Sequence, residues 1–117
     1  MTGFLTRTLG RLGTVDHEAG ELKQDAEKAG CSPISSQNMR SYVAIHGVLR
    51  SVTLRPVDGV SALEAELYDG SASVTLVWLG RRKIEGIEPG RQLTAHGRLG
   101  IRNGGLVLYN PRYELGA

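Results

Sequence analysis

The sequence predicts a mainly β protein, in which a small barrel of five short strands follows an N-terminal helical extension. After about residue 40, short apolar runs recur between Gly, Asp and Pro, whereas the first 40 residues contain few β-branched positions. Sixteen of the 117 residues are glycine, about twice the usual ~7%, and they follow no repeat period. This pattern favours many tight turns between strands. We therefore divide the chain into a helical extension with its linker at 1–40 and a β domain at 41–117.

The composition excludes several broad classes of protein. A chain of 117 residues holds one small domain, and a net charge of +2 fits neither a polybasic tail nor an acidic disordered segment. No apolar run approaches the ~18 residues of a membrane span, and the first residues lack the ~7-residue apolar core of a secretory signal. The single cysteine, Cys31, has no internal disulfide partner. We therefore expect a cytoplasmic protein with no membrane partner.

Two helices are predicted in the extension, at residues 3–12 and 15–29. The first places three leucines on one face, and the second ends before Gly30 and Pro33. The apolar stripe of the second helix is too small to hold an isolated helix in water. The helix therefore either docks on its own barrel or is ordered by another chain, and the long connector from Ser32 to Ser41 favours docking. The stripe consists of Val15, Ala19, Leu22, Ala26 and Ala29.

The first three strands are predicted at 42–54, 61–68 and 73–79. The alternation of apolar residues slips across His46–Gly47, which predicts a glycine bulge that bends the first strand. Asp69–Gly70 is a hairpin signal between the second and third strands. If Gly70–Ser71 is the two-residue turn, counting outward from it places three apolar pairs on one face, so the register supports itself. The pairs are Leu67 with Val74, Ala65 with Leu76, and Leu63 with Trp78.

The last two strands are predicted at 92–99 and 106–113, joined through the hairpin signal Asn103–Gly104. Gly97 is expected to permit close packing at a strand bend. A bent first strand, a meander, a connector and a closing hairpin form the plan of the five-stranded OB-fold Greek-key barrel. The alternative is an SH3-like barrel, which normally lacks an insert between its third and fourth strands. The expected core contains Val43, Ile45, Leu63, Leu67, Val74, Leu76, Trp78, Leu93 and Leu106.

The β domain also resembles a known family. From Ser41 to Leu115 the chain is similar to actinobacterial stand-alone OB-fold nucleic-acid-binding domain proteins and to the wedge (OB) domain of RecG-type helicases. Most of the shared marks are turns and core positions, so they specify the fold more than a ligand. The resemblance implies an OB module that binds nucleic acid. The marks are Asp69-Gly70, Val77-Trp78, Gly80-Arg81-Arg82, Pro89-Gly90, His96-Gly97 and Asn110-Pro111-Arg112-Tyr113.

No pattern in the sequence indicates an enzyme. The three histidines lie on a predicted helix and on two different strands, and none has a second ligand at metal spacing. The glycine-rich segments GRLG and GIRNGG are not followed by the Lys-Ser/Thr of a phosphate-binding loop. We therefore expect no catalytic residue, no metal and no cofactor.

Single-stranded nucleic acid, DNA or RNA, is the expected partner. OB-folds bind it with cations and flat side chains on strands two and three and on the loops between strands one and two and between strands four and five. Tyr68 is placed to stack a base, and a basic cluster follows the third strand. The alternative for that cluster is a solvated loop that pairs with Glu85 and Glu88. The candidate residues are Arg55, Tyr68, Arg81, Arg82, Lys83, Arg102 and Arg112.

Two features limit this interpretation. Glu64 and Glu66 share the outward face with Tyr68 and repel phosphates, while Trp78 faces the core. A net charge of +2 also predicts weak binding at physiological salt. The alternative function is a protein-interaction or assembly adaptor. In that case the outward carboxylates and the N-terminal helices meet a partner protein or a second copy of the chain.

Overall fold

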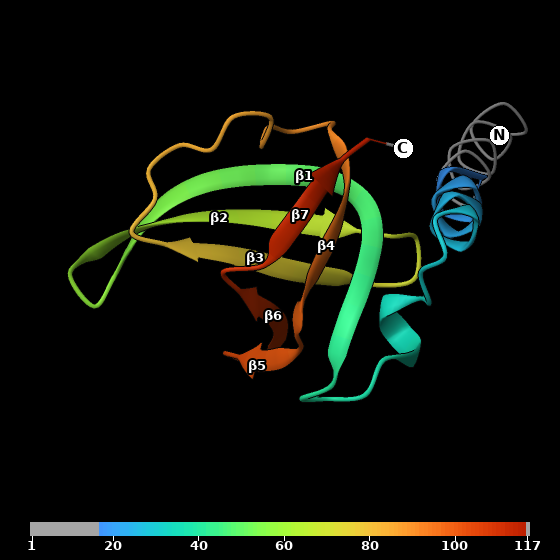
Figure 1. Ribbon diagram of the computed structural model, residues 1–117, viewed down its shortest axis with the longest axis horizontal. Helices are drawn as coiled ribbons and strands as arrows, with labels where there is room; N and C mark the ends of the chain where they lie inside the picture. Colours follow the sequence, from blue (N-terminus) through green and yellow to red (C-terminus); the bar gives the residue numbers. More distant parts are fainter. Residues whose placement is uncertain (1–16, 117) are drawn as a thin grey trace, which may run out of the picture.

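A closed β-barrel forms the body of the molecule (Figure 1), in a computed structural model that describes residues 17–116. The described part begins with a helix at 17–28 and a short 3-10 helix, η1 (Ile34–Ser36). The first helix predicted from the sequence, at 3–12, lies outside the described residues. No helix in the described part of the chain is long and apolar enough to cross a membrane. The strands are β1 (Tyr42–Val57), β2 (Val60–Tyr68), β3 (Ser73–Leu79), β4 (Gln92–Arg98), β5 (Gly100–Arg102), β6 (Gly105–Tyr109) and β7 (Arg112–Leu115).

Strand pairing runs around the barrel. The sheet order is β5-β6-β3-β2-β1-β4-β7. β4 leads into β5 and β6 into β7 with only one or two residues between them. β4 and β5 therefore act as one bent strand, and β6 and β7 as another. The first of these strands pairs with β1 through β4, and it pairs with the second through β4–β7 and β5–β6, so the sheet closes into a barrel. β3 pairs with β6 in parallel, and this pairing joins the β1–β2–β3 meander to the strands of the closing hairpin.

The described residues form seven strands, so the predicted count of five is wrong. The predicted fifth strand is divided at Asn110–Pro111, because proline has no N–H for the ladder and Asn110 adopts a positive φ of 48°. The predicted fourth strand ends before Leu99. The backbone of Leu99 instead bonds to the segment before β1, donating to Ser41 O and accepting from Arg40 N.

β1 is bent by a bulge, but not at the predicted position. The register with β2 shifts between Leu49 and Ser51, so Arg50 is the extra residue. Gly47 serves another purpose. A Cβ atom there would overlap the carbonyl oxygen of Tyr68, so glycine lets the two backbones approach. At Gly97 a Cβ would lie 3.5 Å from Leu108 Cδ2, an ordinary contact, so the tight packing predicted there is wrong.

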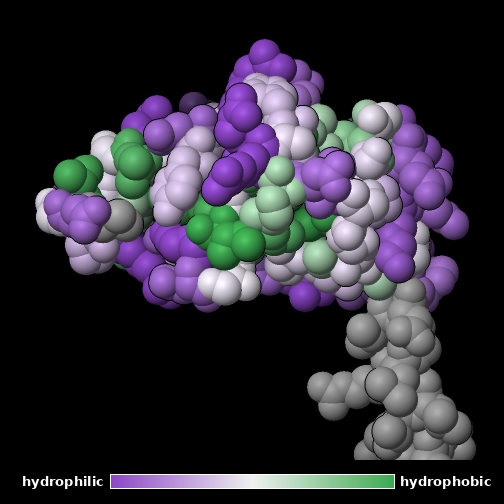
Figure 2. Space-filling view, turned by 90° about the horizontal axis from the view of Figure 1, so that it is seen from below, coloured by the Kyte–Doolittle hydropathy of each residue, from purple (hydrophilic) through white to green (hydrophobic). Residues whose placement is uncertain are grey.

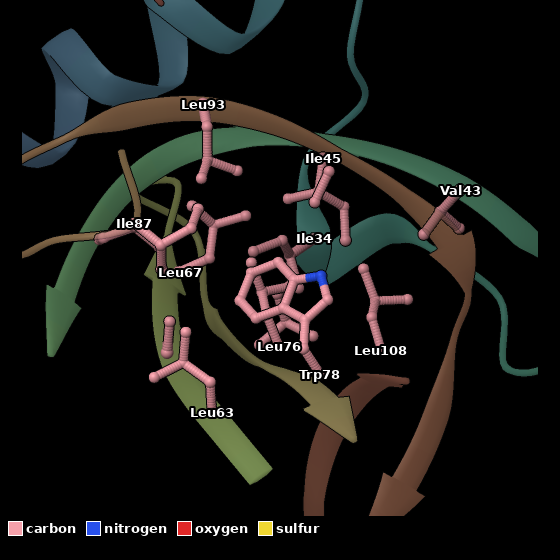
Figure 3. Close-up of a cluster of buried hydrophobic side chains, with 14 of the residues drawn as sticks. Ile34, Val43, Ile45, Leu63, Leu67, Leu76, Trp78, Ile87, Leu93 and Leu108 are labelled. Carbon is pink, nitrogen blue, oxygen red and sulfur yellow. The ribbon is translucent and has the colours of Figure 1, made fainter. Parts of the chain in front are cut away.

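The core agrees closely with the sequence analysis. Eight of the nine predicted core residues are buried, and Leu106 packs against them partly buried. The predicted β2–β3 register is confirmed at all three apolar pairs. Trp78 points inward, where its Nε1 donates to Pro111 O at 3.0 Å and its ring stands nearly perpendicular to that of Tyr113, with the ring centres 5.8 Å apart. Figure 3 shows its indole in the middle of the cluster, together with Ile34 from the connector.

The N-terminal helix docks at the β2–β3 turn of its own barrel (Figure 1). Leu22 and Ala26 are buried, and the carbonyl oxygen of Ala19 lies so close to Gly70 that a Cβ there would overlap it. The connector continues this contact through η1, whose Ile34 is 1% exposed. Docking is therefore confirmed for the described part of the helix. Cys31, at the start of the connector, is buried, and desolvation followed by the charge of Asp69 raises the pKa of its thiol.

Candidate nucleic-acid interface

The outer face of β1, β2 and β3 presents polar side chains in cross-strand rows. The register aligns Ser51, Glu66 and Thr75 in one row and Thr53, Glu64 and Val77 in the next. The rows border a shallow groove of about 160 Å³, which we call the outer groove. It is lined by Ser51, Thr53, Arg55, Glu64, Ala65, Glu66 and Thr75.

Four of the predicted phosphate-binding cations gather at one end of this face. Arg55 lies opposite Ala62, which lies opposite Leu79, and neighbouring strands are about 4.8 Å apart. Gly80 N donates to Ser61 O at 2.8 Å, so the connector leaves β3 beside the β1–β2 hairpin. The three cations that follow Gly80 are exposed. We call this cluster the basic end, and it consists of Arg55, Arg81, Arg82 and Lys83.

The basic end is not neutralised in the way that the alternative interpretation required. Among the described residues, no ion pair joins its cations to Glu85 or Glu88. Glu88 instead pairs with Arg91 at 3.6 Å. Exposed apolar side chains lie at the same end, and Figure 2 shows hydrophobic atoms there among hydrophilic ones, at the left. These apolar residues are Leu54, Val60 and Leu79.

Arg102 is held by a carboxylate and does not stand free for a phosphate. Its guanidinium donates to both oxygens of Glu64, at 2.9 Å and 3.1 Å. The Glu64 side chain is only 9% exposed, and these hydrogen bonds raise the pKa of Arg102. Arg102 therefore cancels the charge of Glu64 on the outer face, and its predicted phosphate contact stays a prediction.

Tyr68 is also engaged within the protein. The guanidinium carbon of Arg50, the bulge residue of β1, lies 3.6 Å from the centre of its ring. The hydroxyl of Tyr68 donates to Gly70 O at 3.4 Å. One face of the ring is thus covered, and a base has only the other. The sequence analysis did not identify Arg50, since only the position of the bulge brings it over the ring.

Two tyrosines near the end of the chain differ in exposure. Tyr109 lies opposite Val77 on the outer face, and it is 46% exposed. Tyr113 packs against Trp78 in the interior. Tyr109 therefore offers an aromatic ring on this face that is open to solvent.

Arg112 lies apart from the other candidates. It is on β7, directly opposite His96 on β4, and β7 pairs with no strand of the β1–β2–β3 face. The structure thus brings Arg55, Arg81, Arg82 and Lys83 together but not Arg112.

Two of the histidines contact polar groups of the protein. The carboxylate of Glu114 lies 3.8 Å from His96 Nε2. His46 is buried on β1, where its Nδ1 lies 2.8 Å from Thr94 Oγ1.

Comparisons with known proteins place the fold. No family model and no curated protein matches the chain. Among solved structures, it is similar to the HINb domain of p204, with a TM-score of 0.61 and 18% identity over 78% of this chain and 49% of that one. It is also similar to RecG, solved bound to a three-way DNA junction, with a TM-score of 0.52 and 19% identity over 74% of this chain.

The chain spans about half the length of the HINb chain and 14% of the RecG chain. Identities below a fifth carry information on fold and not on activity. The likeness to RecG agrees with the resemblance found in the sequence at the level of the fold. By its architecture and its structural neighbours, the chain is a mainly β protein with an OB-like fold.

Proposed function

We propose that this protein is a non-enzymatic, cytoplasmic OB module of the Greek-key type that binds single-stranded DNA or RNA weakly, without a metal or a cofactor. The observation that carries the proposal is the basic end. Four cations from two separate segments of the chain lie together, exposed and without an ion pair among the described residues. The likeness of the fold to RecG, solved on a DNA junction, supports the same class of partner.

The phosphates of the strand meet Arg55, Arg81, Arg82 and Lys83. The strand then crosses the outer face, where Arg102 has already neutralised Glu64. Tyr109 offers an open ring for stacking, which contributes about 1–3 kcal/mol per base in proteins of this kind. A net charge of only +2 keeps the affinity low at physiological salt.

The adaptor alternative loses two features on which it relied. The apolar residues of the N-terminal helix, Leu22 and Ala26, are buried against the same chain. The carboxylate of Glu64 is occupied by Arg102. Of the features that the sequence suggested for a protein partner, Glu66 keeps its charge, and the helix predicted at 3–12 lies outside the described residues.

Fluorescence anisotropy with labelled 15-nucleotide single strands of DNA and RNA tests the proposal. Four phosphate contacts correspond to a salt slope of roughly −3, so affinity falls about 50-fold between 50 mM and 200 mM salt. Replacing two of the cations, in Arg81→Ala/Arg82→Ala, weakens binding and lowers the magnitude of the slope by about 1.4.

The matched control is Lys23→Ala/Lys28→Ala, which removes the same charge from the N-terminal helix. It is expected to bind like the parent protein. Equal losses in the two double variants would show that only net charge matters and would contradict a site at the basic end. Absence of binding even at 50 mM salt would contradict the function itself and leave the adaptor.

A further inference from the structure

The outer groove contains one carboxylate whose charge is not cancelled. Glu64, on the same strand, is bound through both oxygens by Arg102. Glu66 is half-buried, and Ser73 Oγ donates to its Oε1 at 3.1 Å. Among the described residues, Oε2 of Glu66 has no hydrogen bond. The side chain is thus oriented by one contact, and both oxygens retain lone pairs for a ligand.

Hydroxyl groups flank this carboxylate on both sides. Ser51 on β1 and Thr75 on β3 lie directly opposite Glu66 in the same cross-strand row, and all three line the outer groove. A hydroxyl both donates and accepts, so the row presents acceptors at its centre with donors beside them. N–H donors of a ligand match the carboxylate, and a carbonyl oxygen beside them accepts a hydrogen bond from one of the hydroxyls.

The groove is continuous with the basic end. Arg55 belongs to both, since it lines the groove and stands in the row that leads to Leu79 and the connector. A strand whose phosphates lie at the basic end can therefore place a base at the groove. A buried or half-buried carboxylate there repels the backbone, but it attracts the donor groups on the edge of a base.

We propose that the outer groove is a base subsite that selects guanine, with Glu66 as the residue that determines specificity. This inference rests on the proposed function. Guanine presents two donors side by side, N1–H and the N2 amino group, which match the two oxygens of one carboxylate, and its O6 accepts from a hydroxyl. Proteins read unstacked bases through hydrogen bonds on this edge.

The other bases fit the row less well. Cytosine offers a single donor group, its N4 amino group. The N6 amino group of adenine stands beside the acceptor N1, which a carboxylate repels. Thymine and uracil carry one N–H between two carbonyl oxygens, so only one of the two carboxylate oxygens finds a donor.

Anisotropy titrations of the full chain with alternating 10-nucleotide strands, (TG)₅, (TI)₅, (TA)₅ and (TC)₅, test the inference. They are performed in lithium chloride, which disfavours guanine quadruplexes, with DNA and with the uracil-containing RNA equivalents. We expect (TG)₅ to bind about tenfold tighter than (TA)₅, as for one good bidentate contact. Inosine differs from guanosine only by the missing N2 amino group, so (TI)₅ is expected to bind about threefold more weakly than (TG)₅.

Two variants assign the effect. Glu66→Gln replaces one acceptor oxygen by an amide donor, and it is expected to remove the guanine preference while (TA)₅ binds at least as tightly as before. Glu85→Gln makes the same change of charge on the exposed connector, and it is expected to keep the preference. Retention of the preference in Glu66→Gln would overturn the assignment to this residue.

The outcomes separate this inference from the proposed function. Salt-sensitive binding with equal affinities for all four strands would overturn the guanine subsite and leave the proposed function standing. Absence of binding to every strand at 50 mM salt would overturn the proposed function, and the subsite with it.

Discussion

At the scale of single residues, two glycines on paired strands make a matched test of backbone packing. A Cβ at Gly47 would overlap Tyr68 O and lie 2.8 Å from its carbonyl carbon, and a backbone in mid-barrel cannot move aside. At Gly97 the nearest atom is a side-chain methyl at 3.5 Å. We expect Gly47→Ala to lower the free energy of unfolding by about 1–3 kcal/mol, as overpacking does, and Gly97→Ala to change it by less than about 0.5 kcal/mol.

Urea denaturation followed by circular dichroism measures both variants under the same conditions. Equal stabilities of Gly47→Ala and the parent protein would show that the β1–β2 approach is looser than described. The sequence indicated a special role for Gly47 but assigned it to a bulge. Val43, Ile45 and Leu49 all point into the core at odd-numbered positions, so the inward face of β1 does not change at Gly47. It changes only after Leu49, where the register shifts and Val52 becomes the next residue to pack on the core.

Asp69 is a second residue on which much local structure depends. It is 1% exposed, and its Oδ2 accepts from the backbone N–H of Ile34 at 2.8 Å. Its Oδ1 accepts from Ser71 N, Ser71 Oγ and Ala72 N. Asp69→Ala leaves the N–H of Ile34 buried without a partner and is expected to cost about 3 kcal/mol of unfolding free energy.

Chemical denaturation of Asp69→Ala beside Glu85→Ala tests this expectation. Glu85 is an exposed carboxylate on the connector, so its removal is expected to change stability by less than about 0.5 kcal/mol. A loss below about 1 kcal/mol in Asp69→Ala would mean that water satisfies the freed groups. The sequence identified Asp69 only as a turn residue, because its bond to Ile34 spans 35 positions and leaves no local pattern.

At the scale of elements, hairpins were predictable and interruptions of strands were less so. The β2–β3 register followed from counting outward from Gly70–Ser71, and both residues of the predicted hairpin turn Asn103–Gly104 adopt the positive φ that such a two-residue turn requires. The break at Asn110–Pro111 had a signal, since proline cannot donate. The end of β4 at Leu99 had none, because Leu99 is apolar and in phase, and its bonds to Arg40 and Ser41 depend on the tertiary fold.

The candidate site was predictable only in its charges. The sequence located Arg55 and the Arg81–Lys83 cluster, but alternation alone did not show that a strand register brings them together. It assigned Arg102 and Tyr68 to ligands, whereas Glu64 and Arg50 occupy them. Arg50 lies on the strand next to Tyr68, and the bulge brings it over the ring, whereas Glu64 and Arg102 lie on strands that β3 and β6 separate in the sheet. Local propensity encodes neither pair, because each depends on the tertiary fold.

At the scale of the whole molecule, the N-terminal helix and the basic end lie at opposite ends (Figure 1). The helix at 17–28 carries four acidic and two basic residues, while the basic end carries four cations. Removal of the helix is therefore expected to change the stability of the protein without weakening nucleic-acid binding at the basic end. Deletion of residues 1–28 keeps Cys31 and Ile34 of the connector but exposes the surface that Leu22 and Ala26 cover.

Burying a leucine contributes about 1.5–3 kcal/mol, so the truncated chain is expected to unfold about 8–16 °C below the full chain.

Residues 1–28 contain five acidic and four basic side chains, so their removal raises the net charge from +2 to +3. Below its melting temperature, the truncated protein is expected to bind single strands at least as tightly as the full chain, because the basic end is unchanged. Calorimetry and anisotropy on the same preparation measure the two effects. An unchanged melting temperature would contradict docking of the helix, and a loss of binding in a folded truncation would place part of the nucleic-acid site on the N-terminal segment.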